Sequence, residues 1–384
     1  MQIEHLNNML YSLDEICLIP AKVTNISHRS ECNPSYENKM PIYIAPMTPL
    51  VDTNNVDQLN DIGFSTILPR SINFDERIEY MKKGYCIAVG LKEAEHLYGR
   101  FSTIKIQNGS LDYIPKICID QANGHMNELL EICKKLKSVL GQNGIWIMTG
   151  NIANPNTYYA YAEVGIDAVR IGIGGGNVCT TSVQTGIHYP MASLIVECNN
   201  IKKDIKKYIK NTSDADIESI KNELLKRSII DIQNKYKSVP LIIADGGFKR
   251  IDQIIKALAL GADYVMVGEI IAKGKEACGK ITTNWHGGEL YEVREYYGMS
   301  TERAQLEFHD NTYSDDNIKY KHSEGISKYV IIEYSLKDWK SNFNSSLKSA
   351  MSYTNHKNLE DFVGNVDWDI MSNTSFNNYF KSES

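Results

Sequence analysis

The chain of 384 residues is long enough for one large barrel or two average domains, and 42% hydrophobic with 23% charged residues excludes general disorder. A formal net charge of −6 and a pI near 5.9 argue against binding nucleic acid or anionic membranes through bulk charge. No basic-then-apolar leader and no membrane-length apolar run is present, so we expect neither secretion nor membrane insertion. Eight scattered cysteines without a C-x-x-C pair indicate a reducing, cytoplasmic setting.

Short β-type apolar runs alternate with helical patterns, which is typical of repeated β-α units around a parallel sheet. We predict eight strands at residues 42–47, 64–70, 85–90, 116–120, 145–151, 168–174, 240–247 and 264–269. Because these runs are apolar throughout rather than alternating, they favour a closed (β/α)8 barrel of the α/β class. Active sites of such barrels lie at the carboxyl ends of strands. Those ends carry Asp120, Asn151, Gly174 to Thr181, Asp245 to Gly247, and Gly268.

We expect a single barrel domain over residues 1–384, with two additions to the repeat. Residues 199–239 space their apolar side chains three and four apart, which predicts an enlarged sixth helical region, a solvated amphipathic helix in preference to a partner contact. After the last strand, residues 272–384 exceed what a barrel needs. Within them, residues 300–325 are predicted to form a mobile flap, because residues 307–322 are polar and free of glycine. Residues 371–384 are expected to be a frayed tail.

Glycines after the seventh and eighth predicted strands indicate a phosphate site built from backbone N–H groups. Asp245, just before two of these glycines, is placed to accept hydrogen bonds from ribose hydroxyls, although it could instead cap the following helix. Glu269 follows Gly268 and would repel a phosphate unless it turns away or a lysine compensates its charge. Lys273 and Lys321 are the candidates for that lysine.

The stretch "IGIGGGNVCTTSVQTG", residues 171–186, ends an apolar run in three glycines and places Cys179 before two threonines. A loop rich in backbone amides favours the thiolate form of a cysteine, so Cys179 is a candidate nucleophile. The alternatives are a buried structural cysteine and a tight glycine turn without a ligand.

This loop resembles the catalytic loop of the IMP dehydrogenase and GMP reductase family, usually G-I-G-P-G-S-x-C-T-T-R-x-x-T-G. Other motifs follow in the family's order: "RSE" at 29–31, "DQANGH" at 120–125, "GN" at 150–151, "ADGG" at 244–247, "YGMS" at 297–300 and "SEG" at 323–325. The resemblance covers about residues 14–362. It implies a (β/α)8 barrel that binds a purine nucleotide and forms a covalent thioimidate between its loop cysteine and purine carbon 2.

The resemblance also implies roles for individual residues. Cys179 would attack the purine, and Thr181 and Glu324 would assist release of ammonia. Substrate contacts would come from Asn177, Asp245, Gly246, Gly247, Gly268, Glu269, Gly298, Met299, Ser300, Lys321 and Gly325. NADPH contacts would come from His28, Arg29, Arg70, Asp120, Gln121 and Ala122, with the first two as candidates to reach the site of a neighbouring subunit in a homotetramer. The backbone carbonyls of Gly174 and Gly176 are candidate ligands of K+.

Within the family, the sequence favours GMP reductase. IMP dehydrogenases usually insert regulatory CBS modules after the second strand, but here "FDERIEYMKKGYCIAVG" runs directly into the third. Their hydrolytic step also uses an Arg-Tyr pair on the flap, whereas Tyr313 has no Arg before it. We therefore expect reductive deamination of GMP to IMP. The alternatives are an IMP dehydrogenase without CBS modules and a catalytically silent nucleotide-binding paralogue.

Several positions depart from the family pattern. Gly175 replaces proline, Asn177 replaces a phosphate-binding serine, Ser182 replaces an arginine linked with the cation site, and Glu269 replaces Gly or Ser. These departures permit a changed substrate, such as the deoxynucleotide dGMP.

Overall fold

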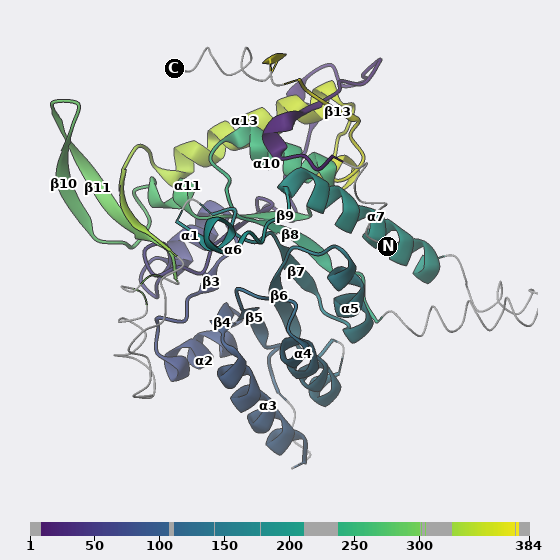
Figure 1. The fold of residues 1–384 in the computed structure, drawn as a ribbon, viewed down its shortest axis with the longest axis vertical. Helices are drawn as coiled ribbons and strands as arrows, with labels where there is room; N and C mark the ends of the chain where they lie inside the picture. Colours follow the sequence, from purple (N-terminus) through teal and green to yellow (C-terminus); the bar gives the residue numbers. More distant parts are fainter. Residues whose placement is uncertain are drawn as a thin grey trace, which may run out of the picture.

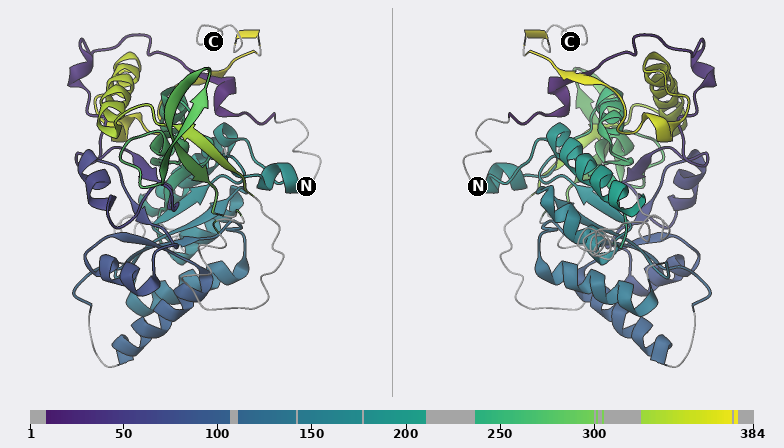
Figure 2. Two further views of the ribbon diagram at one scale, coloured as in Figure 1. Left: turned by 90° about the vertical axis from the view of Figure 1, so that its left-hand side faces the viewer. Right: turned by 90° about the vertical axis from the view of Figure 1, so that its right-hand side faces the viewer.

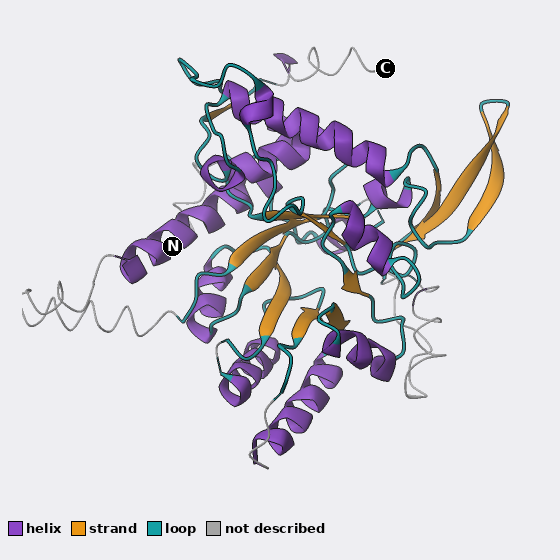
Figure 3. Ribbon diagram, turned by 180° about the vertical axis from the view of Figure 1, so that it is seen from behind, coloured by secondary structure: helices purple, strands orange, loops and turns teal. Residues whose placement is uncertain are grey.

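Eight parallel strands form the centre of the molecule (Figure 3). The computed structural model describes residues 9–106, 111–141, 143–176, 178–210, 237–299, 301, 304, 325–372 and 374–375. The strands are β2 (Ile42–Ile44), β3 (Ile67–Leu68), β4 (Cys86–Val89), β5 (Lys116–Asp120), β6 (Trp146–Ile152), β7 (Ala168–Ile171), β8 (Leu241–Asp245) and β9 (Tyr264–Val267). All eight predicted strands are confirmed, with most of them shorter than predicted.

The sheet closes into a barrel. Its strand order is β2-β9-β8-β7-β6-β5-β4-β3, and the two ends of this order meet through residues next to β3. The N–H of Ile44 donates to the carbonyl of Ser65 at 2.9 Å, and the N–H of Ser65 donates to the carbonyl of Ile42 at 2.9 Å. The predicted (β/α)8 class is therefore confirmed.

Helices follow the strands, and the longer ones cover the outside of the barrel (Figures 1 and 3). They are α1 (Val56–Ile62), α2 (Phe74–Lys82), α3 (Leu91–Ile106), α4 (Asn127–Leu140), α5 (Asn156–Val164), α6 (Thr181–Thr185), α7 (Met191–Lys210), α10 (Ile251–Leu260) and α11 (Glu269–Ala272). Helix α4 illustrates why such helices pack on the sheet. Its residues Leu129, Ile132 and Leu136 fall on one face and are at most 2% exposed. Only α2 lies between β3 and β4, so this crossover holds no CBS module.

The predicted additions are only partly within the described residues. Helix α7 begins at Met191, before the expected start of the enlarged helical region, and is described to Lys210. Residues 211–236 lie outside the described residues, as do all of the predicted flap except 301, 304 and 325 and most of the predicted tail. Among the described helices, none combines the length and apolar character needed to cross a lipid bilayer.

The C-terminal region contains strands and helices that the sequence reasoning missed. A hairpin of β10 (Ile281–His286) and β11 (Glu289–Tyr297) extends away from the barrel, and β12 (Ser327–Ile331) pairs with β11 (Figure 1). The sequence did carry a signal for the hairpin, the pair Gly287–Gly288 between two strand-like runs. In the structure both glycines adopt positive φ, at 59° and 89°.

Two segments far apart in the sequence, one near residue 17 and one near residue 369, pair at one end of the molecule (Figure 2). Strand β1 (Ile16–Leu18), which follows the short helix η2 (Leu13–Glu15), pairs antiparallel with β13 (Trp368–Ile370). Helix α13 (Leu336–Tyr353) packs beside the short helix η3 (Arg29–Glu31), and α14 (Leu359–Phe362) follows it. In α13, Trp339 stacks on Phe343 at 5.4 Å between ring centroids and lies 6.1 Å from Phe64, the residue just past the end of α1. This aromatic cluster attaches α13 to the barrel.

We expect Phe343→Ala to lower the free energy of unfolding by about 3–5 kcal/mol, because it removes a fully buried ring from that cluster. Urea denaturation followed by circular dichroism measures the effect. Tyr353→Ala on the same helix is the control, since Tyr353 is 66% exposed and its loss should cost about 0.5 kcal/mol or less. Equal effects of the two substitutions would show that the cluster does not stabilise the fold.

Candidate active site

A cavity of about 240 Å³ opens at the carboxyl ends of the barrel strands. Most residues selected from the sequence line it: Asp120, Gln121, Ala122, Gly174, Gly176, Cys179, Thr181, Asp245, Gly246, Gly247, Gly268, Glu269, Gly298 and Met299. They come from four strand ends or the loops after them and from the segment after β11. The barrel thus gathers residues spread over nearly 180 positions of sequence into one site.

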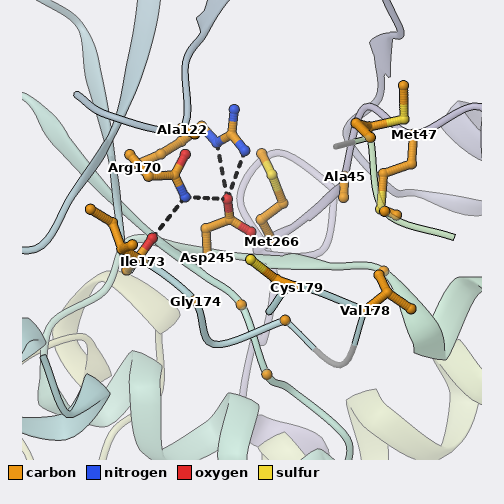
Figure 4. A pocket seen from close by; sticks show the side chains of 18 of the residues that line it. Ala45, Met47, Ala122, Arg170, Ile173, Gly174, Val178, Cys179, Asp245 and Met266 are labelled. Carbon is orange, nitrogen blue, oxygen red and sulfur yellow. Dashed lines mark hydrogen bonds and ion pairs between the residues drawn. The ribbon is translucent and has the colours of Figure 1, made fainter. Parts of the chain in front are cut away.

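Arg170 connects the two sides of this cavity (Figure 4). It lies on β7, and its guanidinium donates to Asp245 Oδ2 from Nη2 at 2.7 Å and from Nε at 3.1 Å. On its other side the same guanidinium pairs with Asp120 Oδ1. Asn151 Nδ2 donates to the same oxygen of Asp245 at 2.7 Å. One oxygen of each aspartate is thereby occupied, while Asp245 Oδ1 and Asp120 Oδ2 accept no hydrogen bond from the described residues.

The ion pairs fix the charge of this cluster. Burial alone would lower the pKa of Arg170, but the carboxylates of Asp245 and Asp120 outweigh it and hold that pKa well above its ordinary value. The guanidinium therefore remains charged. It compensates one of two carboxylates that would otherwise repel each other across a small cavity.

The glycines of the two neighbouring loops allow backbone to pack directly on backbone. A Cβ on Gly172 would collide with the carbonyl of Asp245, and one on Gly247 would lie 2.5 Å from the carbonyl oxygen of Gly175. Both residues have positive φ, 117° and 83°. The glycines therefore let the Cys179 loop lie against the loop after β8, which brings the thiol into the same cavity as Asp245.

Cys179 lies half-buried at the cavity wall, just before α6. Its thiol donates to Thr181 Oγ1 at 3.3 Å, and its backbone pairs with Gly325. By contrast, burial raises the pKa of the Cys118 and Cys133 thiols to about 12, so those two are protonated core residues. Cys179 differs from these two cysteines in being half-buried and in contacting a hydroxyl.

Glu269 also lines the cavity, and its charge is compensated by a lysine other than the two candidates. Its Oε2 lies 2.6 Å from Nζ of Lys328 on β12. Lys273 instead pairs with Glu333 at 2.8 Å, and Lys321 lies outside the described residues. The hydroxyl of Tyr296 lies close to Gly268, where a side chain would collide with it, and burial together with Glu269 raises the pKa of that tyrosine.

Not every predicted residue lines the cavity. His28 and Arg29 lie in or next to η3, and Arg70 packs over Gly90 with its Nε 3.8 Å from Glu93. Gly325 pairs with Cys179 without lining the cavity. Four predicted residues lie outside the described residues: Asn177, Ser300, Lys321 and Glu324.

The two carbonyls predicted as K+ ligands each accept one hydrogen bond within the described loop. The carbonyl of Gly174 accepts a hydrogen bond from the Ser182 hydroxyl at 3.1 Å, and that of Gly176 accepts one from the N–H of Cys179 at 3.0 Å. A carbonyl oxygen has two lone pairs, so each keeps one acceptor position. The K+ site stays a prediction, and we derive no step from a cation.

Sequence reasoning missed Arg170 and Tyr296 as parts of the site, and it placed Asn151 at a strand end without assigning a role to its side chain. Arg170 did carry a signal, since it is a charged residue inside the apolar run "AVRIGIG", where a buried charge requires partners. Tyr296 lies on the strand β11 that was not predicted, although it stands two residues before the predicted substrate contact Gly298.

Fold and cavity together define a (β/α)8-barrel protein with a cavity at the carboxyl face of the strands, where such barrels build their active sites. The model of the IMP dehydrogenase / GMP reductase domain matches residues 11–222 and 227–379, and the chain therefore belongs to that family. It is 29% identical over 381 residues to a GMP reductase of Staphylococcus epidermidis, covering 96% of this chain and 98% of the relative. GMP reductases of Clostridium acetobutylicum and Bacillus subtilis are 28% and 27% identical over 379 residues, with the same coverage of both chains.

We expect Gly247→Ala to destabilise the protein more than Gly84→Ala does. Both positions have positive φ, which costs an alanine about 1–2 kcal/mol, but only Gly247 faces a backbone oxygen, while Gly84 has open space around it. Urea unfolding of both variants measures the difference. Equal losses of stability would mean that the two loops separate at little cost and are not held by close packing.

Proposed function

We propose that the protein catalyses NADPH-dependent reductive deamination of GMP to IMP and ammonia, with a related guanine nucleotide such as dGMP as the other candidate substrate. The observation that carries the proposal is the position of the Cys179 thiol, 3.3 Å from Thr181, in one cavity with the Asp120–Arg170–Asp245 cluster. The family binds purine nucleotides and consists of oxidoreductases that use a nicotinamide cofactor. The named relatives are GMP reductases, which supports the choice of reaction.

The cavity supports one orientation of the nucleotide. Asp245 offers its unoccupied oxygen Oδ1 to a ribose hydroxyl, while Arg170 and Asn151 hold the carboxylate in place. The purine then lies between Cys179 and Met299, and the 5′ phosphate lies over Gly247 and Gly268.

In the first half-reaction the Cys179 sulfur bonds to carbon 2 of the purine. The bond from carbon 2 to the exocyclic nitrogen then breaks, and the nitrogen leaves as ammonia after it is protonated through Thr181, with Glu324 as the second proton-transfer group. Covalent catalysis divides one difficult substitution into two easier steps.

The second half-reaction needs a hydride donor beside carbon 2, and the cofactor supplies that hydride. Asp120, Gln121 and Ala122 form the cavity wall on this side, and Asp120 Oδ2 can accept a hydrogen bond from a ribose hydroxyl. Hydride addition to carbon 2 breaks the carbon–sulfur bond, and Cys179 returns as a thiolate. We propose that the protein acts as the homotetramer implied by the resemblance.

An IMP dehydrogenase without CBS modules is the second candidate function, because it would use the same thiol and the same ribose site. The absence of an arginine before Tyr313 disfavours it. A catalytically silent nucleotide-binding paralogue is the third, and it is disfavoured because Cys179 and Thr181 lie within contact of each other.

We expect the purified protein to oxidise NADPH, followed at 340 nm, when GMP or dGMP is added, and Cys179→Ala to lower this rate by at least about 10³-fold. A parallel reaction with IMP and NAD+ tests the second candidate. No NADPH oxidation with any guanine nucleotide would refute the proposal, and NADH formation from IMP would establish the dehydrogenase instead.

We also expect iodoacetamide at pH 7.5 to modify Cys179 at least about tenfold faster than Cys118 or Cys133, whose pKa values are raised to about 12 by burial. Peptide mass spectrometry gives the modification rate of each cysteine, and GMP should protect Cys179. A Cys179 no more reactive than the two buried cysteines, with or without GMP, would favour the silent paralogue.

A further inference from the structure

Glu269 lies at the end of the cavity next to Gly268, and the cavity as a whole is acidic. The charged residues among its described lining are Asp120, Asp245, Glu269 and Arg170, which leaves an excess of negative charge. The guanidinium of Arg170 is already paired with both aspartates. A dianionic phosphate over Gly247 and Gly268 would therefore meet the Glu269 carboxylate without a cation from these lining residues to offset it.

Lys328 lies immediately behind this wall. It stands directly opposite Tyr296 in the β11–β12 ladder, so both side chains are on the same face of that sheet. Its Nζ is 2.6 Å from Glu269 Oε2 and 5.9 Å from the centroid of the Tyr296 ring. Because Tyr296 and Glu269 both line the cavity, only the side chains of these two residues separate the ammonium from it.

We propose that Lys328 binds the 5′ phosphate of the substrate and that Glu269 is a positioning residue that holds the ammonium at the cavity wall. This inference rests on the proposed function, which makes the ligand a guanine nucleotide. An ammonium has three N–H donors, so Lys328 can donate to Glu269 and to a phosphate oxygen at the same time. The Tyr296 hydroxyl, close to Gly268, is placed to donate to the same phosphate.

The pair explains how a carboxylate can stand at this position. The Lys328 side chain is 32% exposed and that of Glu269 only 17%, so a lone carboxylate here would be largely desolvated and poorly tolerated. Together the two residues add no net charge to the cavity wall. Where the family usually has a neutral Gly or Ser, this chain thus has a carboxylate paired with an ammonium.

Calorimetric titration of the full-length protein with GMP and with guanosine tests the proposal, because the two ligands differ only in the phosphate. We expect Lys328→Met to weaken GMP binding by about tenfold or more and to change guanosine binding by less than about twofold. Glu269→Gln should bind GMP at least as tightly as the unchanged protein, since it removes the negative charge and keeps an acceptor for the lysine. Lys273→Met, which breaks the comparable pair with Glu333 outside the cavity, is the matched control and should change neither affinity.

Three results would overturn the proposal. The first is an unchanged ratio of GMP to guanosine affinity in Lys328→Met. The second is an unchanged protein that binds guanosine as tightly as GMP, which would make Glu269 an acceptor for a 5′ hydroxyl. The third is no binding of either ligand. Thermal unfolding of each variant without ligand shows whether it is folded before its affinities are compared.

Binding and turnover separate this inference from the proposed function. If GMP binds with the expected dependence on Lys328 but no NADPH is oxidised, the phosphate site stands and the reaction is wrong. If NADPH oxidation depends on Cys179 but Lys328→Met leaves the ratio of GMP to guanosine affinity unchanged, the reaction stands and this inference is wrong.

Discussion

The contact of Arg170 with both Asp120 and Asp245 is the interaction on which the site depends. The two carboxylates stand at the ends of β5 and β8, and each has one oxygen on the guanidinium and the other available to a ligand. A buried ion pair of this kind is expensive in desolvation, and removing the cation alone would leave two unpaired carboxylates in one cavity. Its geometry also orients both acceptors, so nucleotide and cofactor would be aligned by a single side chain.

Charge compensation recurs at the other end of the cavity, where Lys328 offsets Glu269. The site thus places a cation beside each of its carboxylates instead of relying on one concentrated basic patch. Between the two clusters, the packing of Gly175 against Gly246 and Gly247 keeps the Cys179 loop close to Asp245. Ion pairs set where the charged side chains of the cavity lie, and glycine packing sets how near the thiol comes to them.

The barrel could be predicted because each strand is a local apolar run whose burial shows in the sequence. The same reasoning placed Asp245 and Cys179 at strand ends, where the cavity forms. Arg170 could not be assigned, because its partners lie 50 and 75 residues away and only the closed sheet brings them together. Lys328 was not predicted for a similar reason, since its contact with Glu269 depends on the unpredicted strands β11 and β12.

The pairing of β1 with β13 joins segments at opposite ends of the chain, with Ile16 opposite Ile370. During synthesis β1 therefore leaves the ribosome long before its partner exists. Until β13 is translated, the nascent chain carries an unpaired strand edge of the kind that associates with other chains. Helix α13, which packs beside η3 near the start of the chain, arrives almost as late. The barrel strands can pair earlier, but the outer layer that joins β1 to β13 is completed only after residue 370 is translated.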